Sequence, residues 1–199
     1  MRIIMKILLL IVFFFASGTA SFAGSVQLTT IVSKPADSGG LPKTGQTILC
    51  QTGDDGDLKK GRPLSGPHYT ADNVNNTITD NGTGLMWINN TSLAGVSGTY
   101  GWSGAITACE GLTYAGHSDW RLPNIAELQS IVNYGRSNLP TIGENDSPSP
   151  WVGTQSGNYW SSTTSISNTL VAWYVSFKFA TVGFFAKAAG CYIRPVRGG

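Results

Sequence analysis

The chain has 199 residues, of which 41% are hydrophobic and only 12% are charged. This composition supplies enough apolar area for a folded core and excludes a chain that is disordered throughout. Twenty-five Gly residues and few acidic ones favour a loop-rich extracellular fold over a helical bundle. Thirteen Lys and Arg stand against eleven Asp and Glu, and two of the basic residues lie in the leader described next, so the remaining chain is neutral. A neutral chain exerts no general attraction on DNA, RNA or anionic lipid, which argues against nucleic-acid binding.

Residues 1–23 have the pattern of a secretory signal peptide. Arg2 and Lys6 form a basic start, an apolar run follows over Ile7–Phe15, and Ser21 provides a small residue three positions before the cleavage point. The run is too short to serve as a retained anchor, because a bilayer takes about 20 residues to span. We expect cleavage after Ala23 and a secreted, periplasmic or cell-surface protein without a transmembrane span.

Residues 24–68 have the composition of an arm or linker. They contain no Trp, and Pro, Gly, Asp and Lys dominate them after the apolar segment Val26–Val32. Asp54–Asp57 brings together carboxylates of the kind that calcium favours. The spacing of an EF-hand and its closing Glu are absent, so a solvated turn is the favoured interpretation and calcium binding stays open.

The aromatic residues mark the folded domain at residues 69–199, where all six Trp and all seven Tyr lie. Thr77–Asp80 leads into the turn pair Asn81-Gly82, which predicts a hairpin. Leu85–Ile88 follows as a buried strand. Trp102–Leu112 has apolar residues at helical spacing and predicts a short amphipathic helix.

A second helix is predicted from Asn124 onwards. Asn124 caps it and Glu127 reaches back to the cap in a capping box. Its buried stripe comprises Ile125, Leu128, Ile131 and Val132. A long irregular loop follows from Gly135 to Asn158. The remaining segments predict strands, at Tyr159-Trp160, Ala172–Phe179, Val182–Lys187 and Cys191–Val196, and the order of elements predicts an α+β domain.

Four segments carry a resemblance to a known family, in the order in which that family has them: Thr83–Trp87, Trp120–Asn124 with Glu127-Leu128, Tyr159–Thr163 and Arg194–Arg197. They resemble the C-terminal domain family of the Legionella collagen-like protein. Upstream, Thr44–Thr47 and Gly53–Leu58 resemble segments that often precede this domain. The resemblance implies a C-type-lectin-like fold with two short helices packed on small antiparallel sheets, a long irregular loop and an N-terminal arm. The collagen-like Gly-X-Y repeats are absent, so the resemblance implies no trimerising stalk.

The resemblance also implies a disulfide between the first helix and the last strand. Here it joins Cys109 to Cys191 and leaves Cys50 as a free or interchain thiol. The family often carries a cysteine where this chain has Pro195, and Cys191 is the candidate to replace it. The fold is distantly similar to that of formylglycine-generating enzymes, which need a reactive cysteine pair. A structural Cys109–Cys191 bridge removes that chemistry.

The hallmark residues of the family are expected to be structural. Large aromatic rings build the core, and a buried Arg bonds to backbone carbonyls or to a carboxylate such as Glu127. These residues are Trp120, Arg121, Trp160 and Arg197.

The sequence contains no clear catalytic pattern. His117, Ser118 and Asp119 are adjacent in one expected turn, which is not how a catalytic triad is built. No metalloprotease, phosphate-loop, nucleophile-elbow or Cys-x-x-Cys motif occurs. We therefore expect a protein that is not an enzyme and has no metal or cofactor.

The expected ligand site is the long loop, because lectin-like folds present ligands to a variable loop on a rigid scaffold. The loop offers an aromatic ring together with amides and carboxylates for sugar hydroxyls: Glu144, Asn145, Asp146, Trp151, Gln155 and Asn158. A solvated loop with Trp151 packed inward is the alternative. The founding domain is associated with adhesion to sulfated polysaccharides, which here would need a local basic patch formed by Lys178, Lys187, Arg194 and Arg197.

The expected function is that of an exported, adhesin-like module that binds an extracellular glycan or a surface protein. The alternative is a structural or assembly module whose edge strands contact a partner chain, and a formylglycine-generating-type enzyme comes third. A glycan-binding loop should keep Trp151 accessible. An assembly module should instead expose an apolar patch or use Cys50.

Overall fold

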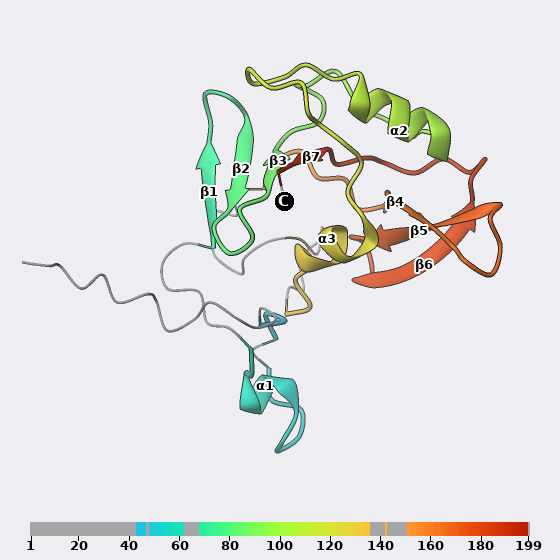
Figure 1. Cartoon of the computed structure of the whole chain (residues 1–199). Coiled ribbons are helices and arrows are strands. Elements are labelled where there is room, and N and C mark those ends of the chain that lie inside the picture. The colour runs from blue at the N-terminus through green and yellow to red at the C-terminus, as the bar shows by residue number, and fades with distance from the viewer. Residues whose placement is uncertain (1–42, 47, 62–67, 136–141, 143–150, 199) are drawn as a thin grey trace, which may run out of the picture. The chain divides into compact units, whose positions relative to one another are not determined.

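The computed structural model describes residues 43–46, 48–61, 68–135, 142 and 151–198. The chain divides into two units, Met1–Ser33 and Lys34–Gly199, and the first of them, with the predicted signal peptide, lies outside the described residues. The second unit has two small antiparallel sheets and short helices, which confirms the α+β class (Figure 1). In the described ranges, no helix has the length and apolarity that crossing a bilayer requires.

The first sheet has the strand order β1-β2-β3-β7. Its strands are β1 (Tyr69–Asp72), β2 (Thr77–Asp80), β3 (Met86–Ile88) and β7 (Val196–Arg197). The predicted turn after β2 forms as expected, because the Asp80 carboxylate accepts hydrogen bonds from the Gly82 N–H at 2.8 Å and the Thr83 hydroxyl at 2.8 Å. Trp87 in β3 pairs with Val196 in β7, so the last strand closes this sheet.

The second sheet has the order β4-β5-β6 and contains β4 (Asn158–Thr164), β5 (Val171–Ser176) and β6 (Thr181–Ala186). The β5–β6 hairpin confirms the prediction that the segments beginning at Ala172 and Val182 pair. The predicted strand Cys191–Val196 forms only in part. Cys191 and Tyr192 each make a single bridge, to Tyr100 and Tyr159, and regular pairing begins at Val196.

The helices are α1 (Asp55–Leu58), α2 (Trp102–Glu110) and α3 (Ile125–Ser130). The predicted capping box of α3 is confirmed, since the Glu127 N–H donates to Asn124 Oδ1 at 2.9 Å and the Asn124 N–H donates to Glu127 Oε2 at 2.8 Å. The carboxylates of the arm are used locally. Asp54 caps α1 and accepts from the N–H groups of Cys50 and Asp57.

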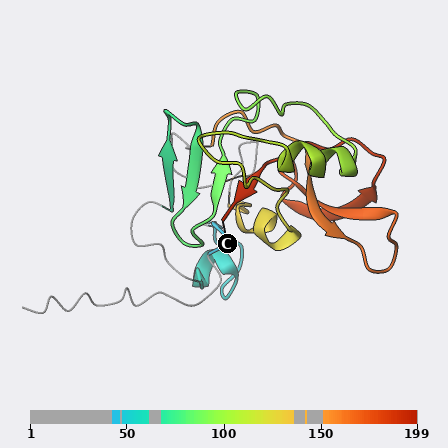
Figure 2. The ribbon, with the colours of Figure 1, turned by 45° about the horizontal axis from the view of Figure 1, so that its top comes forward.

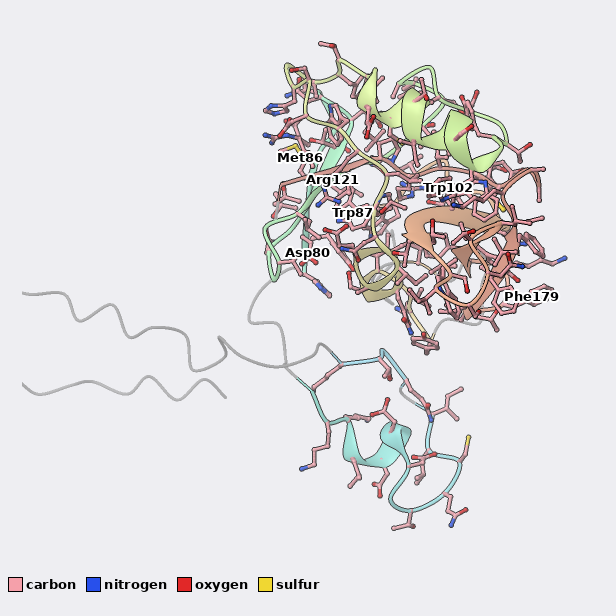
Figure 3. The ribbon with its side chains drawn as sticks, turned by 45° about the vertical axis from the view of Figure 1, so that its right-hand side comes forward. Asp80, Met86, Trp87, Trp102, Arg121 and Phe179 are labelled. Carbon is pink, nitrogen blue, oxygen red and sulfur yellow. The ribbon has the colours of Figure 1, made fainter. Side chains whose placement is uncertain are left out.

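The core consists of two clusters of buried side chains. The first joins both sheets to α3, with Trp87, Leu128 and Val175 among its members, and α3 lies between the sheets (Figure 2). The second joins α2 to the second sheet and contains Cys109, Trp160 and Cys191. In Figure 3, Trp87 lies within the molecule, whereas Phe179, in the turn of the β5–β6 hairpin, lies at its margin.

Candidate functional site

The structure corrects the role expected for Trp151. Only 6% of this residue is exposed. Its ring packs edge-on against Tyr69 at 5.1 Å and Trp87 at 6.3 Å between centroids, and the Arg194 guanidinium lies 5.2 Å from it. An indole in this position contributes to the core and has no open face for a sugar ring. The alternative, with Trp151 packed inward, is the observed one.

The rest of the predicted loop does not assemble a site in the described residues. Glu144, Asn145 and Asp146 lie outside them. Gln155 is exposed, and its backbone N–H donates a hydrogen bond to the Tyr159 hydroxyl at 2.7 Å. Asn158 is half-buried at the start of β4, where its carbonyl accepts from the Tyr192 N–H at 2.9 Å.

The predicted basic patch is also wrong, because its members serve different parts of the fold. Arg194 is fully buried, where it donates to the carbonyl oxygens of Ile88 at 2.8 Å and Asn89 at 2.7 Å. Arg197 forms a two-bonded ion pair with Asp119. Lys187 lies over the Trp102 ring at 3.8 Å. Burial lowers the pKa of Arg194, and the two carbonyl oxygens take the place of water at its Nη1, whereas its Nε–H has no hydrogen-bond partner among the described residues.

The structural role expected for the hallmark residues is confirmed. Arg121, whose side chain is 38% exposed, donates to both oxygens of Glu127, at 2.8 and 2.7 Å. Trp120 and Trp160 are buried, and each indole N–H donates to a backbone carbonyl. These side chains hold loops and helix ends in place.

The Arg121–Glu127 pair makes stability depend on pH. Burial acts to raise the pKa of Glu127, but hydrogen bonds from Arg121 and from the Asn124 N–H outweigh it, so the pKa is lowered. Because the pKa of Glu127 is lower in the folded chain than the unfolded-state pKa of about 4.3, ionised Glu127 stabilises the fold at pH values above that unfolded-state pKa. This contribution is lost as the pH falls through the folded-state pKa. We expect urea unfolding free energies to be level above about pH 5 and to fall below about pH 4. The Glu127→Gln variant should show a shallower fall, and an equally steep one would contradict this origin.

The predicted disulfide is absent from the structure. Cys109 and Cys191 are both free and buried, and Cys50 is free and exposed. The two buried residues belong to the same apolar cluster, where a thiol packs as a small hydrophobic group. Burial raises the pKa of Cys109 to about 12, with Glu110 adding to the rise, and raises the pKa of Cys191 to about 11.

Thiol labelling of the folded chain should therefore stop at one cysteine. At pH 8, Cys50 should react with Ellman's reagent within minutes, while the thiols of Cys109 and Cys191 react only after denaturation, because they are buried and protonated. Detection of a single thiol after denaturation without reductant would show a bridge and contradict the structure.

His117 and Asp119, which are two positions apart, do not form a catalytic pair. The His117 ring meets the edge of Trp120 at 6.4 Å between centroids, and Asp119 is bound to Arg197. Within the described ranges, no group of three or more His, Cys, Asp or Glu could hold a metal ion.

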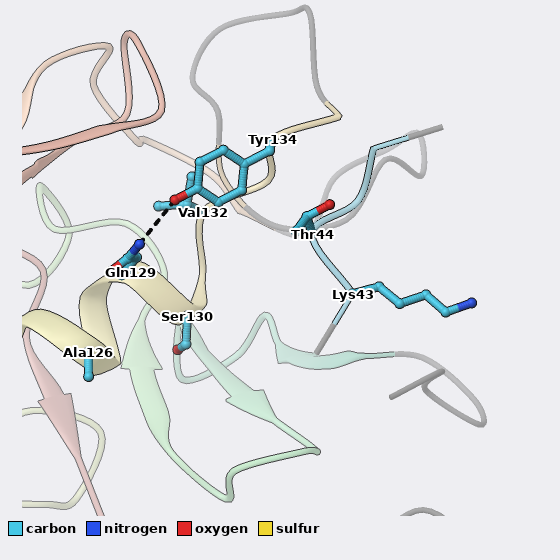
Figure 4. Close-up of a pocket in the computed structure, with 7 residues that line it drawn as sticks. All are labelled: Lys43, Thr44, Ala126, Gln129, Ser130, Val132 and Tyr134. Atoms are coloured by element: carbon cyan, nitrogen blue, oxygen red, sulfur yellow. Dashed lines mark hydrogen bonds between the residues drawn. The ribbon is translucent and has the colours of Figure 1, made fainter. Parts of the chain in front are cut away.

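A pocket that the sequence did not predict lies beside α3, with a volume of about 340 Å³ (Figure 4). We call it the α3 pocket, and it is lined by Lys43, Thr44, Ala126, Gln129, Ser130, Val132 and Tyr134. Tyr134 is 44% exposed, and its hydroxyl accepts a hydrogen bond from the Gln129 amide at 3.2 Å. The pocket combines an accessible aromatic ring with an amide, the combination that was expected of the long loop.

The arm forms one wall of the α3 pocket. The Tyr134 N–H donates to the Thr44 carbonyl at 3.0 Å, which fastens the arm beside the end of α3. Next to this bond the two backbones come so close that a Cβ at Gly135 would lie 1.8 Å from the Gly45 carbonyl oxygen. The feature of the sequence that permits this close approach is the pair Gly45 and Gly135. Because these glycines are 90 positions apart, no local sequence pattern predicts that they meet.

The outer side of strand β6 is a second exposed feature, which we call the β6 edge. The strand has no charged residue, and among the described residues β5 is its single strand neighbour (Figure 1). Phe184 is 59% exposed on one face and Phe185 is 39% exposed on the other. Each ring packs on an aromatic ring of β5, Phe184 on Trp173 and Phe185 on Tyr174.

Comparison with known proteins agrees with the four sequence segments noted above. The family model described as the Lcl C-terminal domain matches residues 76–197, which is more than half of the chain and includes both sheets apart from β1. No curated protein matches the chain. The chain belongs to the Lcl C-terminal domain family.

Proposed function

We propose that this chain is an exported, non-enzymatic binding module with a C-type-lectin-like fold, and that its α3 pocket binds one sugar ring of an extracellular glycan. The observation that carries the proposal is the accessible Tyr134 ring beside the Gln129 amide in a cavity of about 340 Å³. That volume is at the lower end of the range of ligand pockets, which suits a single small ring.

The polar groups of the pocket match sugar hydroxyls. The Gln129 amide gives one N–H to Tyr134, so its carbonyl oxygen and second N–H remain available together with the Tyr134 O–H. Ser130 donates its hydroxyl proton to the Glu127 carbonyl and keeps acceptor capacity. Ala126 and Val132 provide apolar wall. Figure 4 shows the Lys43 side chain pointing away from Tyr134 and Gln129, which favours a neutral ring over an acidic one.

The buried thiols support the non-enzymatic part of the proposal. Formylglycine generation needs a reactive cysteine pair, whereas burial holds Cys109 and Cys191 in the protonated form. Export is proposed from the leader at residues 1–23, and no cofactor is proposed.

Titration of the ¹⁵N-labelled chain with D-glucose, D-galactose, D-mannose and N-acetyl-D-glucosamine, followed by NMR, tests the pocket. We expect at least one of them to shift the amide signals of α3 and Tyr134, with a Kd on the order of 1 mM, because a ligand of this size gains little free energy per atom. Tyr134→Ala should abolish the shifts and Tyr134→Phe should retain most of them, because the ring is kept.

Gln155→Ala is the matched control for Gln129→Ala, since both change an exposed Gln but Gln155 does not line the pocket. The control should leave binding unchanged, while Gln129→Ala should weaken it about tenfold. Sugar-induced shifts that map elsewhere, or equal losses in the two variants, would contradict the proposal.

The second candidate function, a module that contacts a partner chain through an edge strand, is favoured by a different observation. The uncharged β6 edge exposes aromatic side chains on both faces. This is the apolar patch expected of an assembly module.

A further inference from the structure

The hydrogen-bond pattern of the second sheet identifies which backbone groups of β6 point outward. The Lys187 N–H donates to the Leu170 carbonyl at 2.9 Å, which makes this a hydrogen-bonded pair of the β5–β6 ladder. Such pairs alternate along an antiparallel ladder, so Thr181, Gly183 and Phe185 also bond towards β5. The N–H and C=O groups of the intervening residues, Val182, Phe184 and Ala186, face away from β5.

The other side of β5 confirms the alternation. The Ser165 N–H donates to the Val171 carbonyl at 3.1 Å, and the Phe177 N–H donates to the Gly157 carbonyl at 2.9 Å, so the odd-numbered residues of β5 bond away from β6. Among the described residues, the backbone bond that reaches these three from outside the hairpin is that of the Ala189 N–H to the Ala186 carbonyl at 2.8 Å, and this oxygen keeps a second lone pair for an added strand. The β6 edge therefore presents three consecutive outward residues.

In the part of the chain that the structure describes, the β6 edge lacks the features that prevent strand pairing. Edge strands are usually protected by charges, Pro, bulges or a covering segment. Thr181–Ala186 contains no charge and no Pro, its register with β5 is regular, and Val182, Phe184 and Phe185 are all exposed. An edge of this kind accepts an added antiparallel strand.

We propose that a second copy of this chain pairs with the β6 edge through its own β6, antiparallel and with the two-fold axis at Phe184. In this register Val182 of each copy faces Ala186 of the other, and all three outward residues are used. If the register shifts by two residues in either direction, one outward residue of each β6, either Val182 or Ala186, no longer faces an outward residue of the other β6. The paired strands then form one continuous six-stranded sheet with an isologous interface.

The charges and rings fit this register. Lys187, the nearest charge to β6 on its C-terminal side, falls opposite the uncharged Thr181, so no like charges meet. On one face the ring pair of Trp173 and Phe184, 5.7 Å apart between centroids, continues into the same pair of the second copy. On the other face Phe185 comes opposite Gly183 of the second copy, beside the Tyr174 ring that covers that glycine.

The small apolar area of the β6 edge indicates a weak dimer. From the exposed fractions of Val182, Phe184 and Phe185 and the usual areas of such side chains, each copy buries on the order of 300 Å² of side chain. A stable interface buries about 800 Å² per partner. The edge therefore supports a weak dimer, with a Kd on the order of 100 μM.

Sedimentation equilibrium of the purified chain from about 10 μM to 1 mM tests the proposal, with reductant present so that Cys50 forms no crosslink. We expect a monomer–dimer equilibrium in this range. Phe184→Lys and Phe184→Glu should each be monomeric throughout, because each places two like charges at the two-fold axis. Leu93→Lys is the matched control, since Leu93 is 68% exposed and lies outside the hairpin, and it should dimerise like the parent chain.

An equimolar mixture of the two charged Phe184 variants decides the register. Opposite charges then meet at the axis, and we expect the mixture to recover dimerisation while each variant alone does not. A parent chain that stays monomeric at 1 mM, charged variants that dimerise like the parent, or a mixture that fails to associate would each overturn the proposal. The sugar titration of the Phe184→Lys variant should match that of the parent, because the α3 pocket includes no residue of β6, so the two proposals fail independently.

Discussion

Replacement of Arg194 by Met should lower the free energy of unfolding by about 3–5 kcal/mol. Met fills much of the volume of the Arg side chain, but it donates no hydrogen bond. The carbonyl oxygens of Ile88 and Asn89, which now accept from Arg194 at 2.8 and 2.7 Å, would be left in a buried environment without these donors. Each unsatisfied buried group costs about 1–3 kcal/mol. Urea denaturation of the two chains at pH 7 measures the difference.

Arg197→Met provides the comparison for this result. Arg197 donates to Asp119, whose side chain is 57% exposed, so water replaces the lost bonds. Exposed ion pairs of this kind contribute at most about 1 kcal/mol. If Arg194→Met costs no more than Arg197→Met, then Arg194 does not carry the structural role that its buried bonds imply.

Truncation of Trp160 should have a comparable effect, with Trp160→Ala lowering the free energy of unfolding by about 4 kcal/mol. The indole is fully buried in the cluster that joins α2 to the second sheet. Removing it leaves a cavity between these elements and deletes the bond from its N–H to the Tyr100 carbonyl at 2.8 Å. Guanidinium denaturation at 25 °C measures the loss.

Trp160→Phe separates packing from hydrogen bonding. The Tyr100 carbonyl also accepts from the Cys191 N–H at 3.1 Å, so it stays bonded when the indole N–H is removed. We therefore expect Trp160→Phe to cost about half as much as Trp160→Ala. Equal costs for the two variants would show that the lost bond, and not the cavity, dominates.

Elements whose cause is local were predictable from the sequence. The capping box at the start of α3 involves residues three apart, Asn124 and Glu127, and it forms as predicted. The turn after β2 depends on Asp80 and the residues that directly follow it. In such cases the spacing of polar groups along the chain is enough to specify their bonds.

The candidate site depends on contacts between distant segments, and the sequence interpretation failed there. Trp151 and the exposed Tyr134 are both aromatic residues near loops, and nothing in their neighbourhoods predicts that the first packs against Tyr69 and Trp87 while the second stays accessible. Arg194 and Arg197 differ in the same way, because one meets buried carbonyls and the other meets Asp119 at the surface. Burial of this kind follows from tertiary packing and has no local signature.

The pairing of β3 with β7 has a consequence for how the chain reaches its fold. Trp87 in β3 pairs with Val196, which is synthesised more than a hundred residues later. The carbonyls of Ile88 and Asn89 likewise gain their donor only when Arg194 has been synthesised. Contacts of such high sequence separation slow folding, and a chain synthesised from its N-terminus cannot complete the first sheet until residues 194–197 have been made. The first sheet therefore stays incomplete until synthesis of the chain is nearly finished, a state that suits the passage through a translocation channel that the proposed export requires.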